Sequence, residues 1–387
     1  MGKAVKGIKG KRIWKILIGA VILVVALLLA VALAGVYAYW SGERSLRGSA
    51  DTQAPKLVSD AMERQRMMDA YEQNAQKTLA WEDDWVVYEG EIFEYKDDCL
   101  NFLLMGIDRM GKIGKKTDLS NWSAGQADTI FVVSLDVAEK KVSIVGLPRN
   151  TMVELEVYGT DGEVSETMYN QICLQYGYAG GGELGLEKMK ERVAELFSGL
   201  PIHGVCAIGF DSLKKIADVL GGIEVTVPED TMINKKAYAA GEKVLLTRSN
   251  IIPYLRYRDV TVLGSPTTRL TRQKEFLKIA VARIVDEVKK NPLFVKELYE
   301  AVLPYMNTDI TLDEAVYLAA QALDYTITDG SFYQLTGEDR RVDFEKPKRE
   351  GDFYDDLYLD EEYLEKVMME VFFRRVVVET GRQAGGN

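Results

Sequence analysis

The feature that most constrains this chain is a run of residues without a charged side chain, from Ile16 to Trp40. Six lysine and arginine residues and no acidic residue precede it within residues 1–15. A membrane-spanning helix needs about 20 apolar residues, whereas the apolar region of a cleaved signal peptide has about 7–15. The length of the run, residues 16–40, therefore favours an uncleaved signal-anchor helix over a cleaved signal peptide.

The distribution of charge predicts the orientation of this helix. Basic residues flank membrane segments on the cytoplasmic side, so residues 1–15 are expected to form a cytoplasmic tail, with everything after residue 40 outside the cell. The chain has a net charge of −11, and since the tail contributes +6, the remaining residues carry −17. Nucleic acid is bound through basic surfaces. We therefore expect a single-pass protein of the cell membrane that binds no nucleic acid.

The scarcity of histidine and cysteine excludes several kinds of chemistry. The chain has one histidine, His203, so zinc sites built from several histidines cannot form. Its three cysteines include no CxxC pair, which argues against zinc ribbons and thiol redox centres. They form either one disulfide with one thiol left over or three buried free thiols. Carboxylates, arginines and a hard metal ion remain as the groups that a functional site can use.

Patterns of apolar residues predict the organisation after the membrane segment. Residues 41–98 are expected to form a stalk that ends in a β-hairpin around Glu89-Gly90. Within residues 99–330, short apolar runs rich in β-formers alternate with amphipathic helical patterns. The predicted strands cover residues 101–107, 129–135, 141–147, 203–210 and 223–227. One predicted helix covers residues 183–197. Three others are predicted to begin at Asp211, Thr271 and Thr311.

This alternation is typical of the α/β class. We expect residues 99–330 to form a single extracellular domain with a central mixed β-sheet flanked by helices. Residues 331–387 are expected to form a C-terminal extension with a terminal helix over residues 360–375.

Two acidic residues lie where loops meet predicted strands. Asp108 directly follows the strand over residues 101–107, and Asp128 directly precedes the strand over residues 129–135. Ligands of α/β proteins bind at strand ends, so the pair is a candidate site. A single aspartate in such a position also serves as a turn former, so neither residue defines a site alone.

Arginines occur near the same strand ends. They are Arg149 after the strand over 141–147, Arg256 and Arg258 alternating along a strand-like segment, and Arg269 and Arg272 flanking the start of the long helix. Such arginines form either surface salt bridges or a site for a polyanion. Arginine binds phosphate through two parallel hydrogen bonds and keeps its charge. Two carboxylates with several arginines fit magnesium and pyrophosphate.

A series of short motifs is similar to those of the LytR-CpsA-Psr family of cell-envelope glycopolymer transferases. They are residues 101–109 (NFLLMGIDR), 127–130 (ADTI), 145–150 (VGLPRN), 169–170 (YN), 210–228, 254–259 (YLRYRD) and 269–273 (RLTRQ). Each motif is short, and the specificity lies in the ordered set, which spans residues 99–290. A short cytoplasmic tail, one membrane helix and an external domain also resemble the family's topology.

The resemblance implies an activity. Family members are thought to transfer a polymer, with its phosphate, from a polyprenyl-pyrophosphate carrier onto peptidoglycan during cell-wall assembly. By position, Asp108 and Asp128 would hold Mg²⁺, and Asp128 is also a candidate base for the attacking hydroxyl. Around the pyrophosphate the family pattern places Arg149, Arg256, Arg258, Arg269 and Arg272, with Arg109 and Gln273 as further substrate-binding candidates. Phosphoryl transfer needs mainly positioning and charge neutralisation, which these residue types provide.

The sequence departs from the family pattern in three places. Gln126-Ala127 stand where an Arg-Ser pair is common, Asn150 stands where an aspartate is common, and residues 264–268 (GSPTT) replace a Gly-Asp-x-Gly segment. None of these changes removes a proposed metal ligand or arginine. Two other functions stay open: a non-catalytic envelope regulator or scaffold that binds polyprenyl-linked glycans, and a hydrolase of the pyrophosphate, which is also a candidate side activity of the transferase.

Overall fold

The computed structural model describes residues 34–49, 53–57, 65–69, 82, 84–120, 124–257, 265–325, 327–343 and 353–376. The predicted cytoplasmic tail and most of the predicted membrane segment over residues 16–40 lie outside these ranges, so the signal-anchor stays a prediction. Among the described residues, no helix combines the length and the apolar character needed to cross a membrane.

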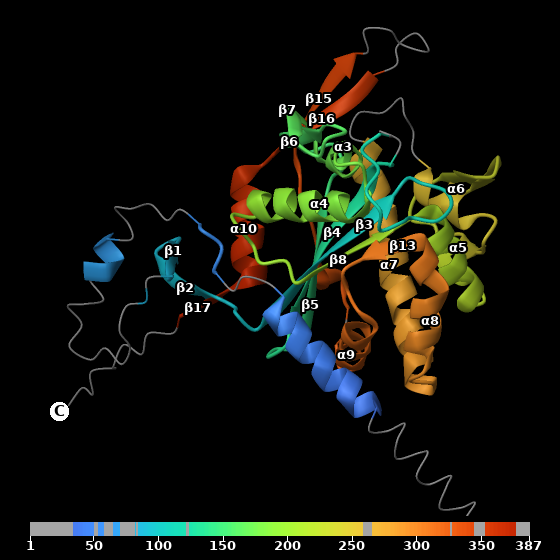
Figure 1. Ribbon diagram of the computed structural model, residues 1–387, viewed down its shortest axis with the longest axis horizontal. Coiled ribbons are helices and arrows are strands. Elements are labelled where there is room, and N and C mark those ends of the chain that lie inside the picture. The colour runs from blue at the N-terminus through green and yellow to red at the C-terminus, as the bar shows by residue number, and fades with distance from the viewer. Residues whose placement is uncertain are drawn as a thin grey trace, which may run out of the picture.

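A six-stranded mixed sheet forms the centre of the molecule (Figure 1). Its strands, in spatial order, are β13 (Met306–Thr308), β8 (Gly204–Ile208), β3 (Cys99–Ile107), β4 (Ala127–Asp136), β5 (Lys141–Leu147) and β14 (Phe332–Gln334). The β3–β8 and β5–β14 pairs are parallel, and the other neighbouring pairs are antiparallel. The predicted α/β architecture with a central mixed sheet is therefore confirmed.

Helices cover both faces of this sheet, which explains why its central strands are apolar along most of their length. On one face, Leu103, Val132 and Val145 pack in a core with α4 (Gly182–Leu196) and α10 (Glu361–Phe372). On the other face, Phe131 and Ile144 pack against α7 (Ser265–Lys290). The same side carries α9 (Leu312–Ala322), whose Tyr317 is buried with Leu46 from a helix over residues 34–48.

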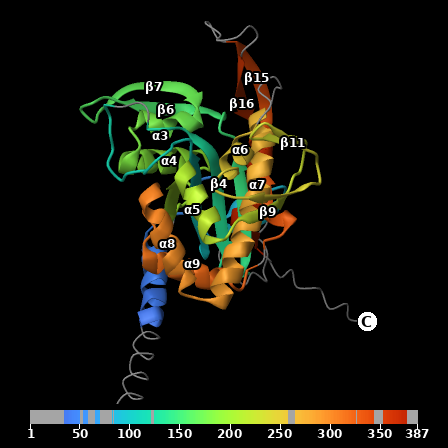
Figure 2. The same ribbon diagram turned by 90° about the vertical axis from the view of Figure 1, so that its right-hand side faces the viewer.

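A second apolar core lies beside the sheet and includes residues of α7, the helix that also packs on the sheet through Leu270 (Figure 2). It is built from α5 (Phe210–Val219), α6 (Ile251–Arg256), α8 (Phe294–Val302), β9 (Ile223–Thr226) and β12 (Lys243–Leu246). A small hairpin of β10 (Thr231–Ile233) and β11 (Lys236–Tyr238) adjoins it. This second core places α5, α6 and α7 together beside one end of the sheet.

The C-terminal residues are integrated into the fold. Two of their strands, β15 (Gly337–Asp343) and β16 (Phe353–Leu359), form an antiparallel pair next to the hairpin of β6 (Met152–Tyr158) and β7 (Val164–Gln171). The following α10 packs in the main core, and β17 (Phe373–Arg375) pairs with β2 (Glu91–Tyr95). In turn, β2 pairs with β1 (Val86–Tyr88) across the predicted Glu89-Gly90 turn, where both residues have positive φ.

Three predicted elements are wrong in detail. The segment that carries Arg256 is the helix α6 rather than a strand, and it tolerates Pro253 because proline fits the first turn of a helix. The long helix α7 begins at Ser265, ahead of the predicted Thr271. The predicted terminal helix ends at Phe372, and the residues after it form β17.

His203 has a structural role just before β8. Its Nδ1 accepts a hydrogen bond of 3.0 Å from the backbone N–H of Asn101, and its own N–H donates to the Asn101 carbonyl at 2.7 Å. These bonds extend the β3–β8 pairing by one residue beyond Phe102 and Gly204. Because the residue is only 8% exposed, burial lowers the pKa of His203 to about 4 from an ordinary 6.5.

The lowered pKa of His203 predicts a loss of stability in acid. Below pH 6.5 the unfolded chain protonates this histidine while the folded protein does not, until about pH 4. The free energy of unfolding should therefore fall by about 3 kcal/mol across that interval because of this residue. Urea unfolding at pH 7 and pH 4 should show a smaller loss for His203→Gln, which keeps an acceptor but does not titrate. Equal losses in the two proteins would contradict the assignment.

Candidate active site

A β-bulge places Asp128 at the edge of the sheet. Gly106 of β3 is opposite Thr129 of β4 and Ile107 is opposite Ala127, so Asp128 is the extra residue between two paired positions. The backbone N–H groups of Asp108 and Asp128 both donate to the carbonyl of Gln126, at 3.0 Å each. Bulges re-aim a side chain and are common beside active sites. At this bulge, the backbone N–H groups of both predicted acidic residues bond to the same carbonyl, that of Gln126.

Asp108 lies in the loop that follows β3. One of its carboxylate oxygens, Oδ1, accepts a 2.7 Å hydrogen bond from the backbone N–H of Gln126. Burial raises the pKa of Asp108 above its ordinary value, and the negative charge of Asp128 raises it further. The hydrogen bond from Gln126 and the charges of Arg149 and Arg256 act in the opposite direction. The two acidic groups are thus electrostatically coupled, as expected for residues that share one site.

Two arginines hold Asp128 from different elements. Arg149, which follows β5, places Nε 3.1 Å from Oδ1 of Asp128, and Arg269 of α7 places a guanidinium nitrogen 3.2 Å from Oδ2. Arg269 also donates to the carbonyl of Asp128 at 3.1 Å. Its position follows from Leu270, which packs against the sheet. All three side chains are largely buried, with exposed fractions of 13% for Asp128, 15% for Arg149 and 5% for Arg269.

Arg149 has two further partners that sequence reasoning missed. It donates to the side-chain oxygen of Gln126 and approaches Sγ of Cys173 at 2.9 Å. Cys173 lies in η1 (Ile172–Leu174), and burial raises the pKa of its thiol. In the sequence, Gln126 differs from the family pattern, whereas no local feature distinguishes Cys173. All three cysteines, Cys99, Cys173 and Cys206, are free.

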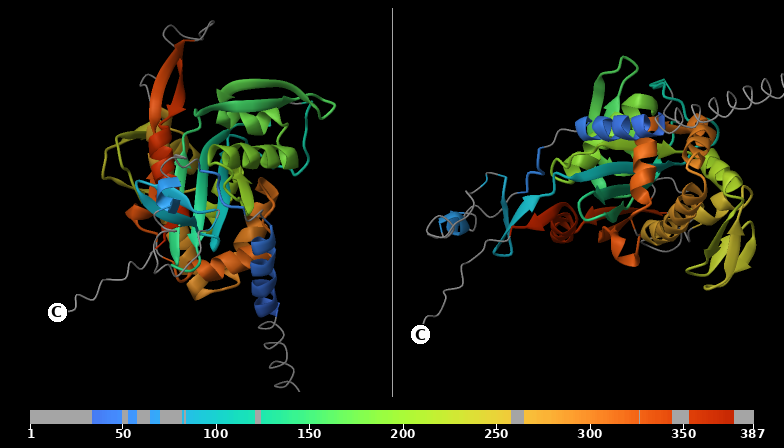
Figure 3. Two further views of the ribbon diagram at one scale, coloured as in Figure 1. Left: turned by 90° about the vertical axis from the view of Figure 1, so that its left-hand side faces the viewer. Right: turned by 90° about the horizontal axis from the view of Figure 1, so that it is seen from below.

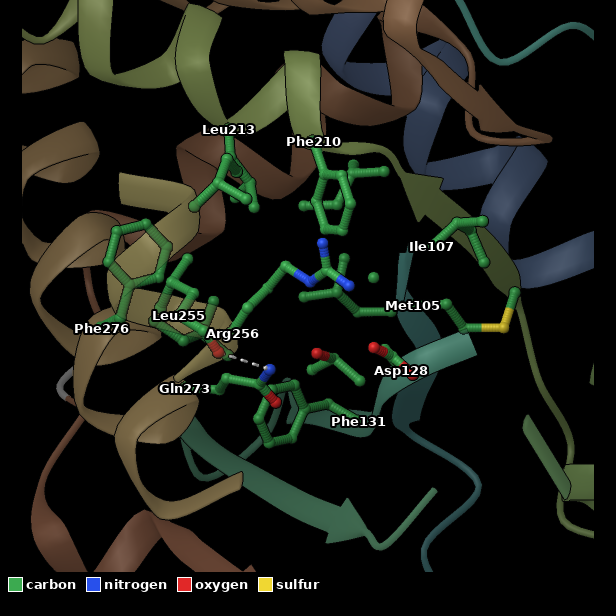
Figure 4. A pocket seen from close by; sticks show the side chains of 16 residues that line it. Met105, Ile107, Asp128, Phe131, Phe210, Leu213, Leu255, Arg256, Gln273 and Phe276 are labelled. Carbon is green, nitrogen blue, oxygen red and sulfur yellow. Dashed lines mark hydrogen bonds between the residues drawn. The ribbon is translucent and has the colours of Figure 1, made fainter. Parts of the chain in front are cut away.

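Arg256 differs from these paired arginines. It is the last residue of α6, and its guanidinium carbon lies 4.9 Å from the ring centre of Phe210. Arg256 is exposed, and the described part of the chain offers it no carboxylate within ion-pair distance. Figure 4 shows its head group pointing into a cavity between Phe210 and Asp128. It is therefore a cation available to an anionic ligand.

The cavity beside Arg256 is mainly apolar and has a volume of about 80 Å³. The sheet and helices α5, α6 and α7 enclose it, and its apolar walls include Leu104, Ile107, Phe131, Leu213, Leu255 and Phe276. Its polar lining includes Asp128, Arg256 and Gln273. Gln273 donates to the Leu255 carbonyl at 3.4 Å, and its buried side-chain oxygen has no hydrogen-bond donor within the described ranges.

The remaining predicted residues are placed differently. Arg272 is 1% exposed and does not line the cavity. It donates to the carbonyl of Tyr257 at 2.6 Å and pairs with Glu229, so it fixes the end of α6 that carries Arg256. Arg109 is half-buried in the loop after β3, where its carbonyl accepts a hydrogen bond from Phe210. Arg258 lies outside the described residues.

The site combines two kinds of surface. Carboxylates and guanidinium groups cluster at the β-bulge, and an apolar cavity opens beside them. Together the fold and the site define an α/β protein suited to a ligand in which an anionic group is joined to an apolar chain.

Comparison with known proteins places the chain in a family. The model of the LytR_cpsA_psr family matches residues 58–349, and the chain belongs to this family. The resemblance seen in the sequence motifs is thereby confirmed.

Two sequence relatives carry the same descriptive name, polyisoprenyl-teichoic acid–peptidoglycan teichoic acid transferase. TagV of Bacillus subtilis (strain 168) is 25% identical over 255 residues, covering 64% of this chain. The match spans 59% of TagV's length, which is less than two thirds. TagU of Enterococcus faecalis (strain ATCC 700802 / V583) is 24% identical over 330 residues, covering 84% of this chain and 87% of TagU.

Solved structures show the same fold. The crystal structure of B. subtilis TagV has a TM-score of 0.51 at 21% identity, covering 71% of this chain and 96% of that one. The structure of protein gbs0355 from Streptococcus agalactiae has a TM-score of 0.52 at 22% identity, covering 71% and 86%.

The arrangement of Asp128 predicts a strong effect on stability. Asp128→Asn removes the charge that compensates two largely buried arginines, so the free energy of unfolding should fall by about 3 kcal/mol. Asp324→Asn is the matched control, because Asp324 forms an ion pair with Lys140 at 2.8 Å while 63% exposed. Exposed pairs contribute about 0–1 kcal/mol, so this variant should unfold near the wild-type urea midpoint. Similar midpoints for the two variants would show that Asp128 does not hold the site together.

Proposed function

We propose that this protein is a membrane-anchored phosphotransferase that moves a glycopolymer from a polyprenyl-pyrophosphate carrier onto peptidoglycan. The observation that carries the proposal is the position of Arg256, a cation without an acidic partner among the described residues, between Asp128 and an apolar cavity. A lipid-linked pyrophosphate has the matching chemistry, an anion joined to an apolar chain. Family membership and the names of TagV and TagU support the same class of reaction.

In the proposed reaction, an acceptor hydroxyl oxygen bonds to the phosphorus that the polymer carries, and the hydroxyl proton passes to the candidate base Asp128. The bond from that phosphorus to the bridging oxygen of the pyrophosphate breaks, and polyprenyl monophosphate leaves. Arg256 binds the incoming pyrophosphate, and Arg149 and Arg269 exchange part of their contact with Asp128 for phosphate oxygens. Gln126 keeps the guanidinium of Arg149 in place during this exchange. Arg272 acts at a distance, as a positioning residue for α6.

Asp108 and Asp128 would hold Mg²⁺. The donor set fits this ion, because magnesium prefers carboxylate oxygens and keeps several water ligands. The buried Oδ1 of Asp128 also lacks an aligned hydrogen bond, although Arg149 lies 3.1 Å away, so it has lone pairs available. When bound, the ion would neutralise charge on the pyrophosphate.

The apolar cavity is the proposed entrance for the lipid chain. Its volume of about 80 Å³ is smaller than the roughly 150 Å³ of an engineered protein cavity that binds benzene. A polyprenyl chain is larger than this space, so we expect α5, α6 and α7, which belong to the second core, to move away from the sheet when the donor binds.

The decisive test is a transfer assay with the full-length protein, a lipid-pyrophosphate glycan, peptidoglycan and Mg²⁺. Arg256→Gln should lower the rate of transfer by about 100-fold or more, since it removes a charge aimed at the reacting phosphate. Its unfolding midpoint should stay unchanged, because Arg256 is exposed. Arg248→Gln is the matched control, an arginine that is 59% exposed and paired with Asp218. A chelator should abolish transfer, and added Mg²⁺ should restore it.

Other outcomes of this assay would select another function. Release of phosphate without transfer to peptidoglycan would identify a pyrophosphate hydrolase. Tight binding of the donor without turnover would identify a scaffold. Unchanged transfer by Arg256→Gln would show that the phosphate binds elsewhere.

A second prediction concerns the apolar cavity. Ile252→Phe adds volume to a side chain of α6 that lines it, which should hinder entry of the lipid. The KM for a long-chain donor should rise about tenfold, while a donor with a short, water-soluble chain should react as with the wild type. An equal loss with both donors would place the lipid outside this cavity.

A further inference from the structure

The structure contains a second groove that neither the phosphate site nor the apolar cavity uses. It has a volume of about 660 Å³ and is lined by residues of the β6–β7 hairpin, α4, β16 and α10. Figures 1 and 3 show how these elements are arranged. Residues from parts of the chain that are far apart in the sequence therefore form its walls. The segment that ends at Leu57 reaches its rim, where the N–H of Lys56 donates to the Ser198 carbonyl at 2.7 Å.

Two tyrosines form an aromatic wall of this groove. Tyr169 of β7 is 59% exposed, and its ring centre lies 6.4 Å from that of Tyr358 of β16, with 35° between the ring planes. The guanidinium of Arg340 lies 4.1 Å from the Tyr358 ring centre and helps to fix that ring. Exposed aromatic rings beside a groove indicate a binding surface, because they offer flat apolar area with a hydroxyl at the edge.

The charge of the groove restricts its ligand. Its lining has four acidic residues and one basic residue, Glu154, Glu195, Glu361, Glu365 and Arg192. Arg192 already pairs with Glu195 at 2.8 Å, so the unbalanced charge is negative. Such a surface repels a phosphate-rich polymer. Its carboxylates are hydrogen-bond acceptors for hydroxyl and amide groups, which an uncharged sugar chain carries.

The groove adjoins the phosphate site along the backbone. Met152, which lines the groove, follows Arg149 by three residues, a span of at most about 11 Å. Met152 also pairs with Gln171, and Gln171 is two residues from Cys173, which contacts Arg149. The backbone therefore places this end of the groove within about 11 Å of Arg149.

We propose that this groove binds the acceptor, the uncharged part of a glycan strand, and presents it to the phosphate site. The proposal rests on the proposed function for the identity of the acceptor. Tyr169, Tyr358 and the surplus of carboxylates support glycan binding in the groove independently of that function.

Calorimetric titration of the full-length protein with an uncharged N-acetylglucosamine oligomer tests the proposal. Tyr169→Ala should weaken binding about tenfold, because it removes the exposed stacking surface. Tyr169→Phe, which keeps the ring, should bind within about threefold of the wild type. Tyr354→Ala is the matched control, since Tyr354 is an exposed tyrosine of the same strand as Tyr358 and does not line the groove. In the transfer assay, Tyr169→Ala should raise the KM for the acceptor and leave the KM for the lipid donor unchanged.

Several results would contradict the proposal that this groove binds a glycan. These are no binding of the oligomer, equal binding by wild type and Tyr169→Ala, or stronger binding of a poly(glycerol phosphate) or a lysine-rich peptide. The experiments distinguish failure of the groove proposal from failure of the proposed function. Binding that depends on Tyr169 in a protein that transfers nothing would uphold the groove and contradict the proposed function. Normal transfer kinetics in Tyr169→Ala would contradict the groove alone.

Discussion

The contact on which the rest of the site depends is the carboxylate of Asp128 between two arginines. Arg149 comes from the end of β5 and Arg269 from the start of α7, so one side chain joins two sheet strands to a helix of the second core. Burying two guanidinium groups without a counter-charge would cost several kcal/mol. The carboxylate removes that cost and sets the orientation of both groups. The β-bulge is what allows a residue of β4 to occupy this place.

The arginines of the site have different tasks because they have different partners. Arg149 and Arg269 are neutralised by Asp128, and Arg272 is neutralised by Glu229 and bonded to backbone carbonyls. Arg256 has none of these partners within the described residues and faces the apolar cavity. A ligand anion gains most from an uncompensated charge. The first contact of a lipid-linked phosphate is therefore expected at Arg256, and the paired arginines follow by exchanging partners.

The central strands β8, β3, β4 and β5 could be predicted from the sequence, whereas the edge strands β13 and β14 and the details of the site could not. The strands β3, β4 and β5 are apolar on both faces, so their runs are visible in the sequence within one or two residues of their observed ends. The segment that ends at Arg256 is short, and its apolar residues suit a strand or a helix; packing in the second core makes it helical. Gln126 and Cys173 hold Arg149 only through tertiary contacts, so the local sequence does not reveal this role. The bulge at Asp128 likewise depends on the register with β3.

Opposite charges on the two sides of the site provide a physical basis for keeping donor and acceptor apart. The cavity side presents Arg256, whereas the groove beyond β6 presents a surplus of carboxylates. A phosphate-bearing donor is attracted to the first surface and repelled by the second, and an uncharged glycan meets no such penalty in the groove. The segment from Arg149 to Met152 joins the two surfaces, so the residue that would contact the phosphate also begins the path to the groove. In a transferase such an arrangement favours productive binding of both substrates at once, because charge rather than shape excludes the donor from the acceptor's groove.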